Sequence, residues 1–580
     1  MIRFSRYFLT AALLGAVIAF AAEPTVPDKS QEAKYREVAQ QIKLFGDIYK
    51  SVSARYVDEI APTDFIKAGI DGMLGTLDPY TVFIEPDETS QLDEITQGKY
   101  GGVGIEIGLR GKNRELTVIS PIEDTPAARK GLRAGDVIIA VEGKSTAGFT
   151  TQDATKLIRG PEGTSVTLTI RRLGVEEPLD YTLERQEIRI HDVNFAGMVT
   201  KDVALIKLAH FSSLAGSELD SALAEVLKYE PKGLILDLRS NPGGLLPSAI
   251  SVAQEFLNTG DPIVSTKGRS PGSDHLFQAG GKPRVPDLPL VVLVNGGSAS
   301  ASEIVSGAIQ DLDRGVIVGT QSFGKGLVQS VMNLSDGAVL KMTTARYYTP
   351  SGRLIQRDRP KQGELALETE DGELDPETGE IIRRETTPQD TVREKFATRA
   401  GRDVFGGGGI TPDIIVEQPI LGMVEIEMFR RDLFFGFVSN WLATHARPDT
   451  VEVTPAMLKA FDHYMDSAKF QPPVPGNDAL TALRKIGEKD SMNAAFFAQL
   501  EDLKKSLAAT VSTNTSEVRD FIKQSLDREL ASALGGRDWR IRSTFDEDVQ
   551  LQKAIEVLRD RNSYSALLTV ATPKTKGKPN

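Results

Sequence analysis

The chain contains no cysteine, which excludes disulfide bonds and every chemistry that needs a thiol. Histidine is also scarce, with five residues, and no histidine stands at the spacing from carboxylates that would hold a metal ion. Basic residues do not dominate either, because the net charge is −12 and the pI about 5.2, which argues against binding nucleic acid. We therefore expect no metal, no cofactor and no nucleic-acid partner.

Long apolar runs are absent except at the amino terminus. Arg3 and Arg6 precede an apolar run from Tyr7 to Phe20, and residues 19–21 form a small-x-small cleavage site. The run is short for a membrane span, so we expect residues 1–21 to be a cleaved signal peptide that directs the chain to a periplasm-like space. An uncleaved anchor that leaves the chain membrane-associated is the alternative. A chain without thiols suits such an oxidising compartment.

The richest chemical signal lies in residues 289–329. An apolar run, Leu290 to Val294, predicts a buried strand; a glycine pair, Ser300 and a helical pattern follow, and after a second strand comes Lys325 between two glycines. A serine where a strand turns into a helix is exposed and rigidly held, as a nucleophile must be. With no histidine in the segment, the base would be a lysine, whose usual pKa of about 10.4 must then fall by roughly 2–3 units through burial.

Each of these residues also has a simpler interpretation. Ser300 and Glu303 fit the capping box of a helix that has no catalytic role. Lys325, taken alone, is typical of a solvated surface lysine. It is their order and setting together that favour a catalytic pair.

The segments Val294–Glu303 (VNGGSASASE) and Ser322–Gln329 (SFGKGLVQ) resemble the active-site region of the carboxyl-terminal processing peptidases, also called tail-specific proteases. This resemblance implies that Ser300 is the nucleophile and Lys325 the base. It also implies that Gln329, four positions after the lysine, hydrogen-bonds the amine and orients it. No metal or cofactor belongs to this mechanism.

A glycine-containing turn, Arg239–Gly244, follows an apolar run that predicts a buried strand. In the resembling family this turn helps to build the oxyanion hole. The resemblance therefore implies that the amide of Gly243 or Gly244, with that of Ala301, stabilises the developing negative charge. A turn that only ends a strand is the alternative.

Upstream, the order of short strands and helices resembles a PDZ domain, and the segments 134–138 (AGDVI) and 141–143 (VEG) carry the match. PDZ domains capture a peptide's terminal carboxylate on backbone amides of a glycine-containing loop. The corresponding loop, beside the helical pattern Thr151–Ile158, consists of Gly102, Val103, Gly104 and Ile105. A PDZ fold used only as a spacer is the alternative. Arg159 follows that helix, and two roles stay open for it: a sensor that reports tail binding to the protease, or an ordinary turn arginine.

The fold class expected is therefore multidomain α/β. The segments are a signal peptide (1–21), a helical segment (22–96), a PDZ domain (97–186), an α/β protease core of the ClpP/crotonase type (187–416, with a charged insertion at about 357–404) and a helical carboxyl-terminal domain (417–580). The first helical segment would either form a dimer or pack on its own chain. Assembly, partner docking and substrate gating all remain open for the last domain.

Together these features predict a secreted serine endopeptidase that recognises protein tails and cuts near them. Its expected partners are proteins or peptides with apolar, free carboxyl termini and a second copy of the chain, with an adaptor protein left open. The rival interpretation is a catalytically inactive PDZ scaffold or peptide-binding module. A chymotrypsin-like PDZ protease would need a histidine–aspartate pair and a Gly-x-Ser-Gly segment, and the Ser300 region has neither.

Overall fold

The computed structural model describes, apart from positions 112 and 449, residues 29–357, 368–369, 372–374, 381–382 and 393–569. The expected signal peptide lies outside these residues. Among the helices of the described part, none combines the length and the apolar character needed to cross a membrane. The chain forms two compact units, residues 1–77 and 78–580.

The first unit is a helical hairpin of α1 (Lys29–Arg55) and α2 (Pro62–Leu74). The rings of Tyr49 and Phe65 stack with centroids 5.6 Å apart, and the Tyr49 hydroxyl donates to the Pro62 carbonyl over 3.1 Å. Several apolar side chains of α1 nevertheless remain exposed, namely Val38, Ile42, Leu44, Phe45 and Ile48. Dimerisation through α1 thus stays a prediction.

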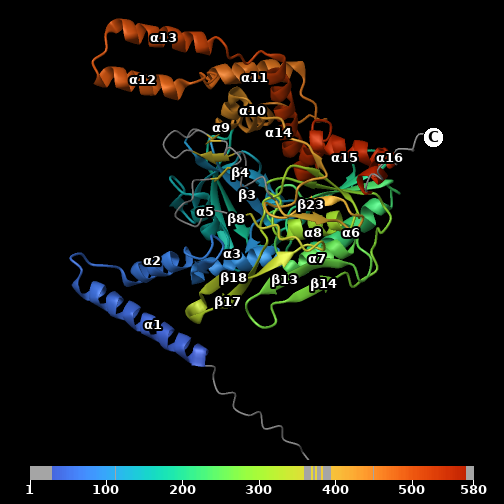
Figure 1. The fold of residues 1–580 in the computed structure, drawn as a ribbon. Coiled ribbons are helices and arrows are strands. Elements are labelled where there is room, and N and C mark those ends of the chain that lie inside the picture. Colours follow the sequence, from blue (N-terminus) through green and yellow to red (C-terminus); the bar gives the residue numbers. More distant parts are fainter. Residues whose placement is uncertain are drawn as a thin grey trace, which may run out of the picture. The chain divides into compact units, whose positions relative to one another are not determined.

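The PDZ region of the second unit is built on a sheet in the order β3-β4-β5-β7-β8, with β6 pairing β5 (Figure 1). Its elements are β3 (Ile105–Arg110), β4 (Glu115–Pro121), α4 (Pro126–Arg129), β5 (Val137–Val141), β6 (Lys144–Ser145), α5 (Thr151–Ile158), β7 (Ser165–Arg171) and β8 (Leu179–Glu184). Alternate side chains of β7 are buried, which explains its period-2 apolar pattern. The strands β2 (Lys99–Gly102) and β9 (Gln186–Arg189) pair where the chain enters and leaves this region.

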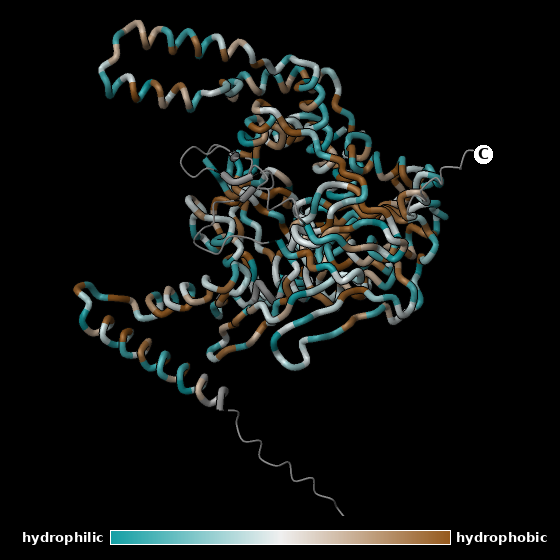
Figure 2. The backbone as a smooth tube through the Cα atoms, viewed as in Figure 1, coloured by the Kyte–Doolittle hydropathy of each residue, from teal (hydrophilic) through white to brown (hydrophobic). Residues whose placement is uncertain are grey.

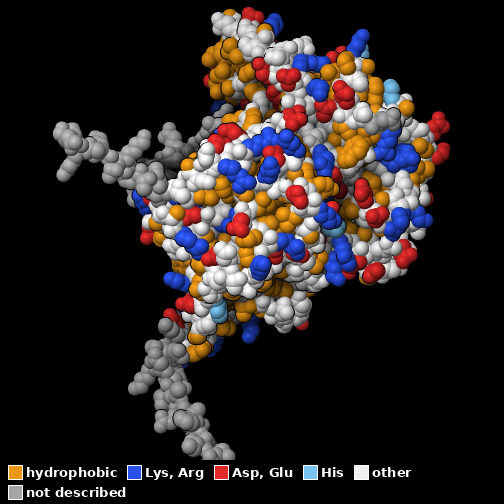
Figure 3. Space-filling model, turned by 90° about the vertical axis from the view of Figure 1, so that its right-hand side faces the viewer, with side chains coloured by type: hydrophobic (Ala, Val, Ile, Leu, Met, Phe, Trp, Pro, Cys, Tyr) orange, Lys and Arg blue, Asp and Glu red, His pale blue; other side chains and the backbone are white. Residues whose placement is uncertain are grey.

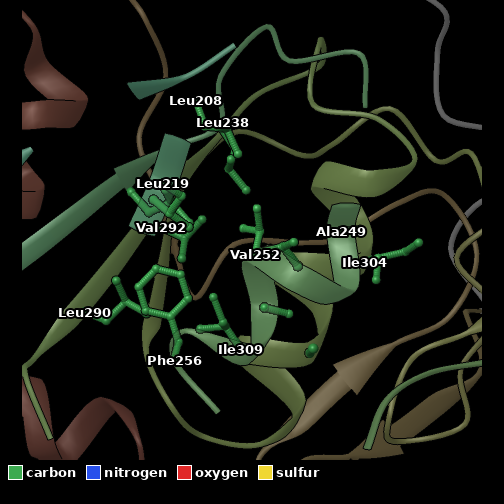
Figure 4. Close-up of a cluster of buried hydrophobic side chains, with 14 of the residues drawn as sticks. Leu208, Leu219, Leu238, Ala249, Val252, Phe256, Leu290, Val292, Ile304 and Ile309 are labelled. Atoms are coloured by element: carbon green, nitrogen blue, oxygen red, sulfur yellow. The ribbon is translucent and has the colours of Figure 1, made fainter. Parts of the chain in front are cut away.

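The protease core is built on a six-stranded sheet in the order β10-β11-β12-β15-β16-β24, parallel except for β10. The strands are β10 (Val193–Met198), β11 (Val203–Leu208), β12 (Gly233–Asp237), β15 (Leu290–Val294), β16 (Val316–Gly319) and β24 (Ile414–Ile415). The helices α6 (Ala215–Leu227), α7 (Leu246–Gln254) and α8 (Ala301–Asp311) contribute to the core on one face (Figure 4). The helices α15 (Val549–Arg559) and α16 (Arg561–Leu567) cover the other face. Burial on both faces explains why β12 and β15 are apolar throughout.

This topology brings three loops to one edge of the sheet. The carboxyl ends of β12 and β15 are neighbours, because Asp237 pairs with Leu293, and those of β15 and β16 are neighbours, because Val294 pairs with Gly319. The segments that follow these strands, residues 238–244, 295–300 and 320–326, therefore lie side by side. In open parallel sheets this edge is where sites form.

A second sheet, in the order β1-β18-β13-β14 with β17 on β18, lies beside these loops. It comprises β1 (Val82–Ile84), β13 (Pro262–Gly268), β14 (His275–Gln278), β17 (Leu327–Asn333) and β18 (Val339–Tyr348), and the short η1 (Ser335–Gly337) precedes β18. Helix α3 (Pro86–Gln97) leads from β1 to the PDZ region. In the segment assigned to the charged insertion, β19 (Glu368–Thr369), β20 (Gly372–Leu374) and β21 (Ile381–Ile382) pair in order.

The last part of that segment packs on the core. The strands β22 (Lys395–Ala397) and β23 (Asp403–Phe405) form a hairpin. Between them Arg402 pairs with Asp313 and Asp413, each over 2.6 Å. The insertion predicted to extend to about residue 404 therefore includes most of a hairpin that is anchored to the core.

The carboxyl-terminal helices contain a core of their own. They are α9 (Met423–Arg430), α10 (Leu433–Thr444), α11 (Pro455–Ser467), α12 (Asn477–Lys489), α13 (Ala494–Ala508) and α14 (Ser516–Arg542). Aromatic rings of α10 and α11 pack together, as with Phe434 on Phe461 at 5.4 Å. Along α12 and α13, apolar and polar residues alternate, as the tube in Figure 2 shows. Side chains of both charges are interspersed on the face shown in Figure 3. The expected multidomain α/β architecture is confirmed.

Candidate active site

Ser300 stands at the turn between β15 and α8 with φ 53° and ψ −109°, a backbone conformation that is strained for any residue with a Cβ atom. It is half-buried, whereas the neighbouring Ser298 and Ser302 are fully buried. The Ser298 hydroxyl donates to the Leu238 carbonyl over 2.8 Å and that of Ser302 to the Asn241 carbonyl over 2.9 Å. Ser300 is therefore the serine of the three that is available for chemistry.

Lys325 lies in the loop after β16, as the sequence predicted. Its Nζ donates to Gln329 Oε1 over 3.0 Å and lies 4.6 Å from the centre of the Tyr80 ring. Gln329 is fixed in turn, because its Nε2 donates to the Tyr80 carbonyl over 2.8 Å. Among the described residues, no hydrogen bond joins Lys325 Nζ to Ser300 Oγ. The lysine is thus held and oriented next to Gln329.

The pKa of the Lys325 amine is lowered to about 8, mainly by burial and to a smaller extent by the positive charge of Lys341. The carboxylates of Glu303 and Asp78 act in the opposite direction but are weaker. A lysine with this pKa is neutral in about a tenth of the molecules at pH 7, far more than a lysine with the usual pKa of about 10.4. This is the property that a lysine base requires.

Glu303 connects the serine turn to the lysine loop. Its buried carboxylate accepts the amides of Ser300, Gly324 and Lys325 over 2.9, 2.7 and 2.9 Å. It also accepts the hydroxyl of Ser322 over 2.5 Å. From the sequence Glu303 was only a helix-capping residue; in the structure it clamps together the two loops that carry the nucleophile and the base.

A tyrosine reinforces this connection. The buried Tyr347 hydroxyl donates to the carbonyl of Ser300 over 3.2 Å and also to that of Lys325. Burial raises the pKa of Tyr347 well above its usual value, so the hydroxyl keeps its proton and remains a donor. Sequence reasoning missed both Tyr347 and Tyr80. The only local signal near Tyr80 is a turn, in which the Asp78 carboxylate accepts the Tyr80 amide over 2.8 Å.

The expected oxyanion loop lies directly against the serine. A Cβ atom on Gly243 would stand 2.8 Å from the Ala301 nitrogen and 2.9 Å from Ser300 Cβ. The Gly243 amide, however, already donates to Asn241 Oδ1 over 2.9 Å. Within the described part of the chain, the amides of Gly244 and Ala301 have no acceptor. Of the two glycines that the sequence left open, Gly244 is thus the one with an available amide, and Gly243 provides space.

The predicted carboxylate-binding loop of the PDZ region has a similar pattern. The carbonyls of Val103 and Gly104 accept the amides of Ala127 and Ile122 over 3.0 and 2.9 Å. The amides of Val103 and Gly104 themselves find no acceptor in the described ranges. Gly104 has φ 77°, where a side chain would also collide with Thr125. The loop is therefore shaped to present amides beside β3 and α5.

Arg159 lies next to this loop, but its guanidinium contacts residues outside it. Its guanidinium stacks 4.1 Å from the centre of the Tyr100 ring and pairs with Glu94 of α3. Burial raises the pKa of Glu94, while the charge of Arg159 opposes this. Arg159 thus links the end of α5 to the helix that follows Tyr80 and β1.

No group of three or more histidine, aspartate or glutamate side chains in the described ranges is arranged to hold a metal ion.

Replacing Lys341 by glutamine should shift the pH dependence of hydrolysis. Without the Lys341 charge the pKa of Lys325 rises, so a smaller fraction of the amine is neutral at any pH below it. The acidic limb of kcat/KM should therefore move to higher pH, and activity at pH 7 should fall. Lys267→Gln removes a charge from β13 of the same sheet and should leave the limb in place. An unshifted limb in Lys341→Gln would contradict this account of the lysine.

Three parts of the chain match known families. Residues 202–361 match the model described as peptidase family S41, residues 117–172 a PDZ domain, and residues 424–558 the C-terminal helical domain of probable PDZ-proteases. The carboxy-terminal-processing protease of Bartonella bacilliformis is 41% identical over 360 residues, which cover 61% of this chain and 81% of that protein. The carboxyl-terminal-processing protease of a Synechocystis species is 40% identical over 292 residues, covering 50% and 68%.

One solved structure also matches part of the chain. The photosystem II D1 C-terminal processing protease is 32% identical, and the match covers 54% of this chain and 89% of that one with a TM-score of 0.32. The family resemblance expected from the sequence motifs is confirmed by the family models and by these relatives.

Proposed function

The chain belongs to peptidase family S41 and is a serine peptidase of the carboxyl-terminal-processing type, and from that premise we propose that Ser300 and Lys325 form its catalytic dyad. Neutral Lys325 takes the proton of Ser300 Oγ as the oxygen attacks the scissile carbonyl carbon. The same proton then passes from Lys325 to the nitrogen of the leaving amine, and the acyl-enzyme forms. Water, deprotonated by Lys325, hydrolyses the acyl-enzyme and restores the serine.

The observation that carries this proposal is the environment of Lys325. Burial lowers its pKa to about 8, and Gln329 Oε1 accepts from Nζ over 3.0 Å. Glu303 and Tyr347 bind the backbones of the serine turn and the lysine loop at once. On this proposal, the hydrogen bond between Ser300 Oγ and Lys325 Nζ forms when the substrate binds. Catalytic hydrogen bonds commonly form only in the substrate complex.

The oxyanion of the tetrahedral intermediate would be bound by the amides of Gly244 and Ala301. Both are available, and Ala301 is the first residue of α8, where the helix dipole favours negative charge. Two preorganised donors of this kind contribute several kcal/mol to the transition state. Gly243 leaves the space that the substrate carbonyl needs.

The PDZ region would select the substrate. Its loop amides at Val103 and Gly104 would bind the carboxylate of a protein tail, and the tail would add a strand to the edge of β3. Arg159 would report this binding, because its partner Glu94 lies on the helix that continues from Tyr80, and Tyr80 holds Gln329 beside Lys325. We also propose export to a periplasm-like space, which the signal-peptide pattern of residues 1–21 in the sequence supports. The homodimer and the adaptor protein stay predictions from the sequence.

A free carboxylate on the substrate should increase its use. Its charge-assisted hydrogen bonds are worth about 1.5–3 kcal/mol, so amidating the carboxyl terminus of a peptide should weaken its apparent affinity by about ten- to a hundredfold. The comparison uses one peptide with an apolar last residue, free or amidated, and a third that ends in aspartate. Equal cleavage of all three would mean that the PDZ region does not select tails, and Arg159 would lose its proposed role.

Hydrolysis of an unfolded protein by the purified chain separates this function from its rival, the inactive scaffold. An active enzyme yields fragments that disappear in the Ser300→Ala variant. A scaffold would bind tail peptides equally well with or without Ser300 and would produce no fragments.

A further inference from the structure

A charged contact links the carboxyl-terminal helices to the expected oxyanion loop. Arg239, the residue after β12 and Leu238, donates through Nη1 to Asp548 Oδ1 over 2.9 Å and to Gln550 Oε1 over 3.0 Å. Its Nη2 lies 2.7 Å from Asp548 Oδ2. The side chains of Arg239 and Asp548 are only 12% and 15% exposed. No local pattern in the sequence predicts that residues 309 and 311 positions later contact this loop.

The other side of the guanidinium is held by the sheet. Arg239 Nε and Nη2 donate to the two oxygens of Asp237 over 2.9 and 2.8 Å, and Lys207 donates to Asp237 over 3.0 Å. The two positive charges hold the pKa of Asp237 well below its usual range. Arg239 is therefore fixed between a carboxylate of the sheet and a carboxylate of the helical region. Removing either one leaves part of a nearly buried guanidinium unpaired.

The loop that begins at Arg239 has little freedom to move independently. Ser240 has φ 56°, and its amide donates to Asn295 Oδ1 over 2.7 Å. The Asn241 carbonyl accepts the Ala299 amide over 3.0 Å, next to the proposed nucleophile. Hydrogen bonds thus connect the two residues that follow Arg239 to the turn that carries the proposed nucleophile, and Gly244 lies three positions after Asn241.

Asp548 is well placed for such a role. It is the N-cap of α15, and its Oδ1 accepts the amides of Gln550 and Leu551 over 3.1 and 3.0 Å. Gln550 is fully buried and donates from Nε2 to the Val416 carbonyl over 2.7 Å. Helix α15 packs on the strands that end at the site. The contact therefore rests on a rigid element.

We propose that Asp548 and Gln550 are positioning residues for hydrolysis, through which the carboxyl-terminal helical region completes the oxyanion site by holding Arg239. They touch neither the substrate nor the reacting atoms. The inference rests on the proposed function, because it assigns a role to the oxyanion loop of that mechanism. It predicts a defect in transition-state stabilisation and not in substrate binding.

The test uses the full-length chain and its Asp548→Ser variant, in which a serine still caps α15 but no longer reaches Arg239. We expect kcat to fall by about 10- to 100-fold with KM nearly unchanged, because misplacing an oxyanion donor affects only the transition state. Binding of a peptide boronate, whose tetrahedral adduct places an oxygen in the same site, should weaken by the same factor. Asp548→Asn retains Oδ1 and the helix cap but places an amide group against Arg239 Nη2. This variant should lose less kcat and less boronate affinity than Asp548→Ser.

The matched control is Arg559→Gln at the opposite end of α15. Arg559 pairs with Asp202 of the core over 2.9 Å, and this pair is more exposed and distant along the helix from Arg239. Its loss should lower stability slightly and leave kcat within about twofold. If both Asp548 variants fold and keep the kcat and boronate affinity of the wild type while Ser300→Ala is inactive, the inference about Asp548 and Gln550 is overturned. The proposed function would not be affected by that result. Activity that survives in Ser300→Ala would instead overturn the proposed function.

Discussion

Replacing Ser300 by alanine is expected to abolish hydrolysis, with a loss in kcat of at least about 10⁴-fold. The physical reason is that the nucleophile and its base act as a unit, so removing either one removes the covalent route. The fold should remain intact, because alanine keeps the backbone of the turn and the amide that Glu303 accepts over 2.9 Å. Fragments from an unfolded protein substrate, measured with purified variants, give the rates, and thermal unfolding verifies the fold.

The neighbouring serines are the controls for this prediction. Ser298 and Ser302 are fully buried, and their hydroxyls are used in hydrogen bonds to backbone carbonyls. Their replacement by alanine should lower stability and retain much more activity than Ser300→Ala. An inactive Ser302→Ala together with an active Ser300→Ala would show that the nucleophile has been assigned wrongly.

The second large effect is expected from Gly243→Ala. A methyl group there would stand 2.6 Å from the Ala299 carbonyl oxygen and 2.8 Å from the Ala301 nitrogen, so the loop must move away from the serine. The backbone φ of 94° adds strain for any residue with a side chain. Because the loop carries the Gly244 amide, we expect kcat to fall by about 10²–10³-fold, the effect of losing an oxyanion donor.

Gly260→Ala separates the two contributions to that loss. Gly260 has a similar φ of 87°, but a Cβ atom there would meet nothing within 4 Å. This variant should therefore lose stability through backbone strain and keep its kcat. A folded Gly243→Ala variant with the kcat of the wild type would contradict the proposed oxyanion loop.

Much of this site could be predicted because its signals are local. The apolar run of residues 290–294 is buried on both faces as a central parallel strand must be, and the turn at Ser300 follows from it directly. The family resemblance implied that Gln329, four positions after Lys325, binds the amine, and the structure contains this hydrogen bond. The choice between Gly243 and Gly244 depended on Asn241, whose side chain accepts the amide two residues on, as in an Asx turn, and so occupies the Gly243 amide.

The remaining contacts could not be predicted because they join residues that are distant in sequence. Tyr80 is 249 positions from Gln329, and Arg239 is 309 positions from Asp548. Such contacts depend on how the second sheet and the carboxyl-terminal helices pack, not on periodicity or turn chemistry. Glu303 was misjudged for a related reason: its cap pattern is genuine, but its bonds to Gly324 and Lys325 appear only once β16 lies beside β15.

The rate at which a fluorophosphonate modifies the enzyme tests the Ser300–Lys325 dyad most directly, because it requires neither a natural substrate nor tail binding. Mass spectrometry of the intact protein and its peptides would give the number and position of adducts. The dyad predicts one adduct, on Ser300, that forms at a rate rising with pH through the Lys325 pKa of about 8. This adduct should be almost absent in Lys325→Ala. An adduct on another serine, or a rate on Ser300 that does not depend on Lys325, would contradict the mechanism.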